Sequence, residues 1–182
     1  MKRWLAALMF VAVCTQPAAA QKFKGDVVLT LQGGIGIPVA TFSHEYGTAP
    51  EFMAQVEYAV SDGTAVGLRG GYRQFKPNDD AVLRESMVIT NFLVQAKRLF
   101  TPDNRFGLYA VGGWGIYWYK ENFQNALSEP AWGGMAGLGL HYEASDKVSF
   151  IAETTYNGFF ANPDGLGYFS VNIGMAIGIR EE

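Results

Sequence analysis

Apolar residues alternate with polar or small residues, with a period of two, over eight segments of the chain. This alternation predicts β-strands, because successive side chains of a strand point to opposite faces. The alternating segments are 27–37, 52–60, 66–74, 88–96, 106–118, 132–142, 148–156 and 169–179. One face, which begins at Val27 and ends at Ile179, contains no Asp, Glu, Lys or Arg. The sequence therefore predicts an all-β protein with one strongly apolar side.

The opposite face contains many glycines and few charges, and its composition indicates which side points inward. Its charged residues are Glu57, Arg69, Arg73, Lys97, Glu143 and Glu153. A soluble exterior would need roughly 25–35% charged residues, whereas the whole chain has 17%. Glycines and small polar groups suit the narrow interior of an eight-stranded barrel. We therefore expect the apolar face to contact lipid. A soluble, lipocalin-like binder with its apolar face inside is the alternative.

Large aromatic residues on the apolar face concentrate near the segment ends, as expected where a barrel meets lipid headgroups. The predicted aromatic girdle comprises Tyr58, Tyr72, Trp114, Trp118, Trp132, Tyr142 and Tyr156.

The connections between the segments alternate in length. Short turns are expected at 61–64, around 102–104 and at 144–147, and longer loops at 38–51, 75–86, 120–130 and 158–167. Outer-membrane barrels have short periplasmic turns and long external loops. The sequence thus predicts an eight-stranded antiparallel up-and-down transmembrane β-barrel over residues 21–182.

Residues 1–20 have the layout of a cleaved signal peptide. Lys2 and Arg3 precede a short apolar run, and three alanines end at Ala20, which places cleavage before Gln21. Cleavage would remove Cys14 and change the net charge from −3 to −5. The acidic balance argues against a nucleic-acid partner, and the single cysteine excludes a disulfide framework.

The charged residues of the polar face are expected to pair inside the barrel, because an unpaired buried charge costs several kcal/mol. A three-residue turn at 62–64 would pair Val60 with Val66 and Glu57 with Arg69. Lys97 and Glu153 are expected nearby, and three cations balance three carboxylates on this face. This pattern predicts a lumen closed by an ionic network that includes Arg73. A narrow channel for small solutes is the alternative.

The eight strands, the signal peptide and the final segment Gly174-Met175-Ala176-Ile177-Gly178-Ile179 together resemble the small OmpA/OmpX-type barrels of the outer membrane protein β-barrel domain family. The resemblance covers Lys24–Arg180. The final segment looks like the Gly-x-x-apolar-x-apolar signal read by the barrel-assembly machinery, although it ends in isoleucine where the family has an aromatic residue. The resemblance implies an outer-membrane location and implies the assembly machinery and periplasmic chaperones as partners during biogenesis.

Catalytic and metal-binding signals are weak. Barrel enzymes that deacylate lipid A carry His-x-Ser on a late strand, where this chain has Glu153-Thr154-Thr155, so no catalytic residue can be assigned. The Ser43-His44-Glu45 triplet lacks convergent side chains, and His141 is expected inside the barrel. Asp79-Asp80 could hold a divalent ion or bridge to lipopolysaccharide, although a solvated loop charge is the simpler interpretation. We expect no cofactor, no metal and no enzymatic activity.

The expected function is therefore structural or interactive. The barrel would sit in membrane lipid and lipopolysaccharide and would present four loops to a possible extracellular ligand. The loop aromatics are either contact sites or groups that fold onto the rim, namely Phe42, Tyr46, Phe123, Phe159 and Phe160. An outer-leaflet lipid-modifying enzyme is the least favoured alternative.

Overall fold

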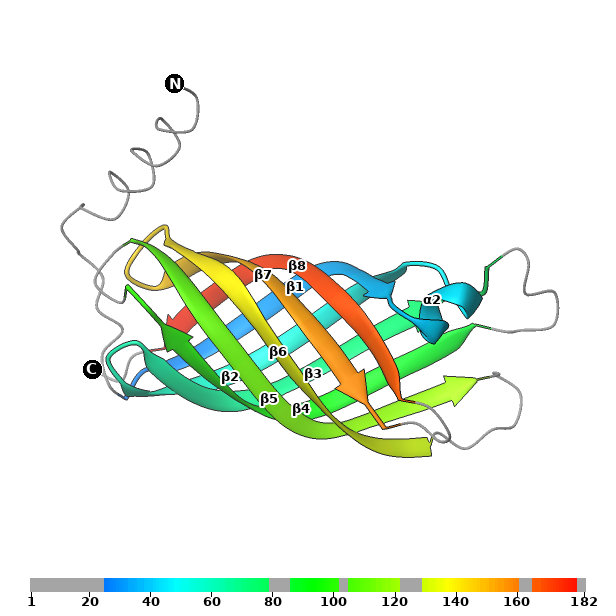
Figure 1. Ribbon diagram of the computed structural model, residues 1–182. Helices are drawn as coiled ribbons and strands as arrows, with labels where there is room; N and C mark the ends of the chain where they lie inside the picture. The colour runs from blue at the N-terminus through cyan, green and yellow to red at the C-terminus, as the bar shows by residue number, and fades with distance from the viewer. Residues whose placement is uncertain (1–24, 79–85, 102–104, 122–128, 161–164, 180–182) are drawn as a thin grey trace, which may run out of the picture.

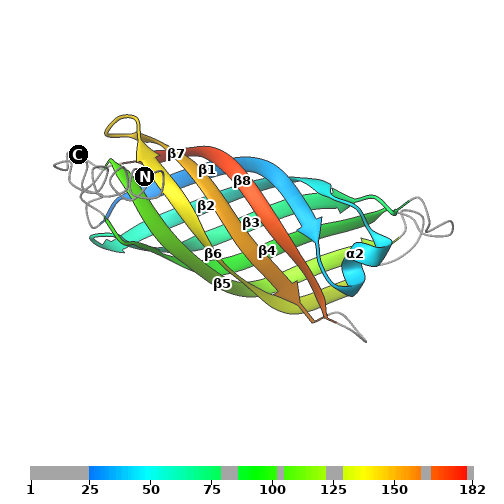
Figure 2. The same ribbon diagram turned by 45° about the horizontal axis from the view of Figure 1, so that its top comes forward.

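The chain forms a closed barrel of eight antiparallel strands in which each strand pairs with its sequence neighbours and β1 pairs with β8 (Figures 1 and 2). The computed structural model describes residues 25–78, 86–101, 105–121, 129–160 and 165–179. The strands are β1 (Val27–Pro38), β2 (Ala49–Ser61), β3 (Thr64–Phe75), β4 (Met87–Leu99), β5 (Phe106–Glu121), β6 (Glu129–Glu143), β7 (Val148–Phe159) and β8 (Leu166–Ile179). The predicted fold class is confirmed. The proposed signal peptide and its cleavage site lie outside the described residues.

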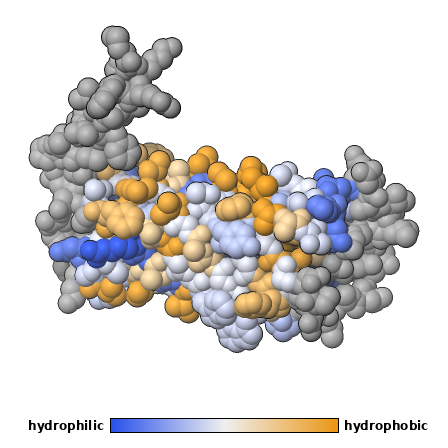
Figure 3. All heavy atoms as spheres, in the orientation of Figure 1, coloured by the Kyte–Doolittle hydropathy of each residue, from blue (hydrophilic) through white to orange (hydrophobic). Residues whose placement is uncertain are grey.

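The apolar face of the strands points outward. Side chains such as Leu31, Phe52 and Ile173 are 59%, 65% and 71% exposed, whereas Arg69 and Glu153 of the opposite face are buried. Figure 3 shows mainly apolar and weakly polar residues on the wall between the two ends of the barrel. The soluble alternative, with the apolar face inside, is therefore wrong.

The two ends of the barrel carry different connections. The short turns join β2 to β3, β4 to β5 and β6 to β7, and the start of β1 and the end of β8 lie at the same end (Figure 1). The connections after β1, β3, β5 and β7 lie at the other end, which we call the loop end. Those after β1 and β3, 39–48 and 76–86, are longer, whereas 160–165 after β7 has the same length as 100–105 between β4 and β5, so the predicted alternation in length holds only in part. Several strands extend further than the alternation alone indicated, and β2 begins at Ala49.

The predicted register of the β2–β3 hairpin is wrong by two residues. Val66 lies opposite Tyr58, Glu57 opposite Gly67, and Arg69 opposite Gln55. The turn itself is tighter than predicted, because Ser61 pairs with Thr64 and Gly63 has a positive φ of 76°. A register shift between Ala59 and Ser61 then places one extra residue in β2. Such a bulge cannot be read from the alternation, since it changes pairing without changing the turn residues.

The connection after β1 contains a short helix, α2 (Thr41–Glu45), that the sequence did not predict. Its N-cap residue, Ala40, has a positive φ of 53° and provides no side-chain cap. The helix contacts β1 and β8 at the loop end (Figure 2). In the described part of the chain, no helix has the length and apolar character needed to cross a membrane.

Candidate functional site

Two ion pairs lie inside the lumen, and one of them crosses it. Arg69 of β3 places Nη2 2.5 Å from Oε1 of Glu153 on β7, and these strands stand on opposite sides of the eight-stranded ring. Lys97 of β4 places Nζ 2.6 Å from Oε2 of Glu57 on β2. All four side chains are at most 6% exposed. Each of the four residues lies on the polar side of its strand, so its side chain points into the lumen.

Hydrogen bonds join the two ion pairs into one network. Gln95 Nε2 donates to Gln55 Oε1 at 2.8 Å and to Glu57 Oε1 at 3.0 Å. The Tyr109 hydroxyl donates to Glu153 Oε2 at 2.9 Å, and Lys97 Nζ lies 4.9 Å from the centre of the Tyr109 ring. Here the lumen network means Gln55, Glu57, Arg69, Gln95, Lys97, Tyr109 and Glu153.

A third ion pair lies closer to the loop end. Arg73 Nη2 is 3.0 Å from Glu51 Oε1 and also donates to Asn91 Oδ1 at 3.1 Å. Sequence reasoning missed Glu51, which it placed in a loop. Among the side chains that the structure describes, the lumen therefore holds three cations and four carboxylates, and the predicted balance of three against three is wrong. The extra carboxylate, Glu51, balances the positive charge of Arg73, which is the buried arginine closer to the loop end.

Each predicted charged residue is therefore in the lumen, but the predicted partners differ in part. The predicted cross-strand pair of Glu57 and Arg69 does not form, because the register places a glycine opposite Glu57. Instead Glu57 meets Lys97 and Arg69 meets Glu153. Removing a charge from water costs several kcal/mol, and pairing with added hydrogen bonds offsets that cost.

Tyr109 extends over the neighbouring strand β6 towards β7 because its partner on β6 has no side chain. Tyr109 is paired with Gly139, and a Cβ built on this glycine would overlap the Tyr109 ring. The ring is 1% exposed. The glycine therefore provides the space that lets the tyrosine hydroxyl meet Glu153.

Aromatic side chains fill the mouth at the loop end. Phe42 of α2 packs edge-on against Phe75 at 4.9 Å and lies 5.2 Å from Tyr46. Phe75 in turn packs against Tyr168 at 5.7 Å, and the Arg73 guanidinium lies 4.7 Å from the Tyr168 ring. We call Phe42, Tyr46, Phe75 and Tyr168 the mouth cluster, and each is at most 2% exposed. Of the two interpretations of Phe42 and Tyr46, folding onto the rim is the one that their burial supports.

Backbone bonds hold the segment that carries this cluster. Tyr46 forms a bridge with Pro77, and Gly47 N donates to Lys76 O at 3.0 Å. Asn78 N donates to Glu45 O at 2.9 Å, and its side chain donates to the Ser43 carbonyl at 3.1 Å. The first connection is thus tied to the chain that follows β3.

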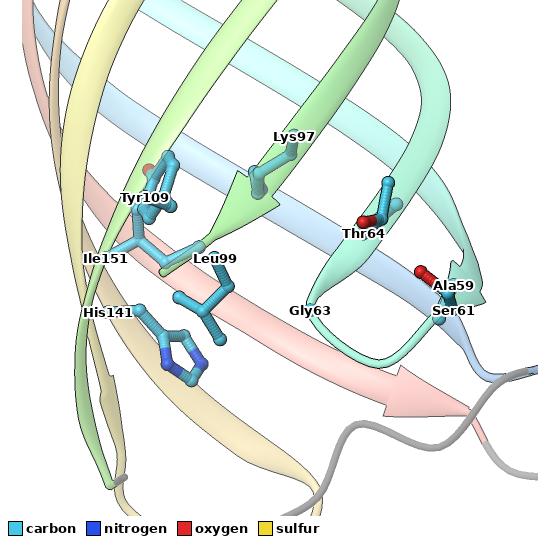
Figure 4. A pocket seen from close by; sticks show the side chains of 10 residues that line it. Ala59, Ser61, Gly63, Thr64, Lys97, Leu99, Tyr109, His141 and Ile151 are labelled. Atoms are coloured by element: carbon cyan, nitrogen blue, oxygen red, sulfur yellow. The ribbon is translucent and has the colours of Figure 1, made fainter. Parts of the chain in front are cut away.

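The short-turn end is also filled by side chains and encloses a cavity of about 20 Å³. That volume holds about one water molecule. Leu99, Tyr109, His141 and Ile151 lie around the cavity, with Lys97 above them (Figure 4). His141 Nε2 is 3.8 Å from Glu143 Oε1, and both residues are buried inside the barrel.

The seven residues of the predicted girdle all lie on the outward side of their strands. Six are 44–59% exposed, and Trp118 is half-buried. Tyr58 and Tyr142 lie towards the short-turn end, whereas Trp118 and Trp132 lie near the loop end of β5 and β6.

The candidate catalytic side chains do not converge. The Ser43 hydroxyl donates to Ala40 O at 2.7 Å, and His44 is exposed. On β7, Glu153 and Thr155 point into the lumen while Thr154 faces outward.

Within the described residues, no group of three or more His, Cys, Asp or Glu side chains could hold a metal ion. Asp79, Asp80 and Phe123 lie outside the described residues, Phe159 is buried, and Phe160 is 71% exposed.

Several solved outer-membrane barrels share this fold. Neisserial surface protein A is 12% identical, with a TM-score of 0.61 over 84% of this chain and 96% of that chain. The N-terminal β-barrel domain of OprF from Pseudomonas aeruginosa is 16% identical, with a TM-score of 0.56 over 86% of this chain and 98% of that chain. Outer membrane protein AlkL is 15% identical, with a TM-score of 0.57 over 92% of this chain and 96% of that chain.

The comparison with curated proteins finds no match. The family model described as "Outer membrane protein beta-barrel domain" matches residues 5–177. This chain has eight strands closed into a ring, an apolar outer wall and a polar interior, which are typical of outer-membrane barrels. The chain belongs to the outer membrane protein β-barrel domain family and is an outer-membrane protein.

Proposed function

We propose that this protein is a non-conducting barrel that anchors its loops at the cell surface, with a structural or surface-interaction role. The loop end faces the exterior, and the short turns face the periplasm, as is typical of such barrels. The lumen network is the observation that carries the proposal, because its bonds link β2, β3, β4, β5 and β7 across the interior.

Three layers of side chains support a closed lumen. The mouth cluster fills the loop end, the lumen network fills the space below it, and Leu99, His141 and Ile151 fill the short-turn end beside Tyr109 of the network. Arg69 and Arg73 are at most 2% exposed, so water has little access to the charges that would line a pore. Met53 and Met135 also contact the Arg69 guanidinium through sulfur at 3.0–3.5 Å.

A narrow channel for small solutes is the second candidate, and the polar side chains along β1 and β8 favour it. Thr30, Gln32 and Asn172 are buried in the lumen, and their polar side-chain atoms have no hydrogen-bond partner among the residues that the structure describes. Such atoms need water. A file of water molecules along this wall would be the path of any conductance.

Planar-bilayer recording separates the two candidates. We expect the wild-type barrel to give no stable single-channel steps. Arg69→Gln removes the buried charge, and Arg98→Gln removes an exposed, outward-facing charge near the short turns and serves as the matched control. Stable steps in the wild type that change in Arg69→Gln, but not in Arg98→Gln, would establish the channel and refute the closed lumen.

The proposed partners follow from this placement. Membrane lipid and lipopolysaccharide would surround the wall, the barrel-assembly machinery and periplasmic chaperones would act during biogenesis, and an extracellular ligand would meet the loops. Replacing residues 79–85 or 122–128 with Gly-Ser linkers should leave the barrel folded, as heat-modifiable migration on a gel would report, and should abolish binding to cells or matrix if those loops carry it. Neither nucleic acid nor a cofactor is part of this proposal.

We further propose that the protein is not an enzyme. The support is the geometry of Ser43, whose hydroxyl is bonded to a backbone carbonyl instead of to His44. Mass spectrometry of lipid A from cells with and without the protein tests this point. A lipid A change that is lost in His44→Ala would contradict it.

A further inference from the structure

A groove of about 510 Å³ runs along the outer wall where β5, β6 and β7 lie side by side. Its outward-facing lining is Trp114, Gly134, Ala136, Tyr156, Gly158 and Phe160. Among the described residues, none that lines the groove is charged. The groove lies towards the loop end, since it continues to Gly165 and Leu166 at the start of β8.

The strands beneath the groove carry almost no side chains of their own, and neighbouring aromatic rings lie close to two of the glycines. Gly134 of β6 and Gly158 of β7 lie directly opposite each other, and both occupy outward positions of their strands. The next outward residue of β6, Ala136, carries only a methyl group and is exposed. Gly134, Gly158 and Ala136 are therefore small residues that lie side by side on two adjacent strands. They leave a depression in a wall that elsewhere carries large apolar side chains.

Flat aromatic rings border the floor. The Trp114 ring lies over Gly134, because a Cβ built on this glycine would be 2.8 Å from Trp114 Cε3. Phe160 continues this border, with its ring 6.2 Å from that of Trp114. On the other side Tyr156 is held by an edge-on contact of 5.3 Å with Phe169, and its ring passes close to Gly158.

We propose that this groove binds one acyl chain of a lipopolysaccharide molecule. The wall of an outer-membrane barrel faces hydrocarbon, so the occupant of an uncharged groove there is an acyl chain. A linear chain gains dispersion contacts from the rings on both sides that it would not gain on a convex wall. Lipopolysaccharide is the source because the groove lies near the loop end, and this step rests on the proposed orientation with the loops outside.

The test measures lipopolysaccharide retained by barrels extracted in mild detergent, with native mass spectrometry as the readout. Ala136→Leu and Gly158→Val fill the floor of the groove. Ala54→Leu is the matched control, since Ala54 is an exposed, outward-facing alanine on β2, across the ring. Heat-modifiable migration of each variant establishes that the barrel has folded, and the two filling variants differ in the strand that they alter.

We expect the wild type and Ala54→Leu to retain lipopolysaccharide through repeated washing. Each filling variant should retain about tenfold less lipopolysaccharide than the wild type. This is the loss of affinity expected when about two methylene groups of the acyl chain are no longer buried. Equal retention by all four proteins, no retention by the wild type, or retention of phospholipid alone would overturn the proposal. Labelling of His44→Cys by an impermeant maleimide in whole cells reports the orientation independently, so a failure of orientation is distinguishable from a failure of the groove.

Discussion

Arg69 and Glu153 meet in the middle of the lumen from strands on opposite sides of the ring, and the Tyr109 hydroxyl binds the second oxygen of the same carboxylate. Because both charges are buried, each depends on the other for its solvation. This pair therefore ties one wall of the barrel to the other.

Removing one member of the pair should destabilise the barrel more than removing both. We expect Arg69→Met or Glu153→Met alone to lower the free energy of unfolding by about 3–5 kcal/mol, because one buried charge is left without its partner. The double variant should recover much of that loss. Urea unfolding in lipid vesicles measures the cycle. Arg98→Met serves as the exposed control, and additive losses in the double variant would contradict the coupling.

The mouth cluster should contribute strongly to stability through Phe42. This ring is 2% exposed and contacts Tyr46 and Phe75, so Phe42→Ala should cost about 3–5 kcal/mol if the site behaves as a core. Phe100→Ala is the control, since Phe100 is 56% exposed. The same unfolding assay applies. Equal small losses in both variants would show that α2 does not close the mouth.

The space at Gly139 should be needed for the position of Tyr109. Gly139→Ala places a methyl group within the tyrosine ring and should cost about 1–3 kcal/mol by overpacking. Gly112→Ala should cost little, because its new Cβ would meet only Met135 O at 3.8 Å. In a Tyr109→Ala background the cost of Gly139→Ala should fall, and an unchanged cost in that background would argue against steric contact.

A charged side chain on the outer wall should destabilise the barrel more when it lies deeper in the membrane. Ile173 lies in the middle of β8 and is 71% exposed, whereas Ile179 ends the strand. We expect Ile173→Arg to cost about 2–4 kcal/mol in vesicles and Ile179→Arg about 0–1 kcal/mol. Ile173→Ala and Ile179→Ala separate the lost side chain from the added charge. Equal costs for the two arginines would contradict a membrane-spanning wall.

The sequence predicted the fold correctly where the same kind of residue recurs at many positions along the strands. The period-two alternation predicted eight strands, and the few charges and many glycines of the polar face predicted that the apolar face points outward. The same logic placed Arg69, Lys97 and Glu153 in the lumen. Which charged side chains pair in the lumen was harder to predict, because side chains from strands far apart in sequence meet there.

Local irregularities account for the remaining errors. The tighter turn and the bulge near Ala59 each shifted the β2–β3 register by one residue and together separated Glu57 from Arg69. The first loop was predicted to extend to residue 51, but β2 begins at Ala49 and includes Pro50 close to its start, where a strand tolerates proline. Glu51 was consequently overlooked as the partner of Arg73. The five-residue α2 has no side-chain cap, so only its tertiary contacts define it.

The pairing of β1 with β8 extends from Val27 opposite Ile179 to Pro38 opposite Tyr168. These are the first and last strands to leave the ribosome, so the seam that seals the ring is also the one with the longest intervening chain. A polypeptide that stops before Leu166 would leave two unsatisfied edges, on β1 and on β7. Synthesis of the final strand therefore sets the earliest moment at which this protein can exist as a barrel.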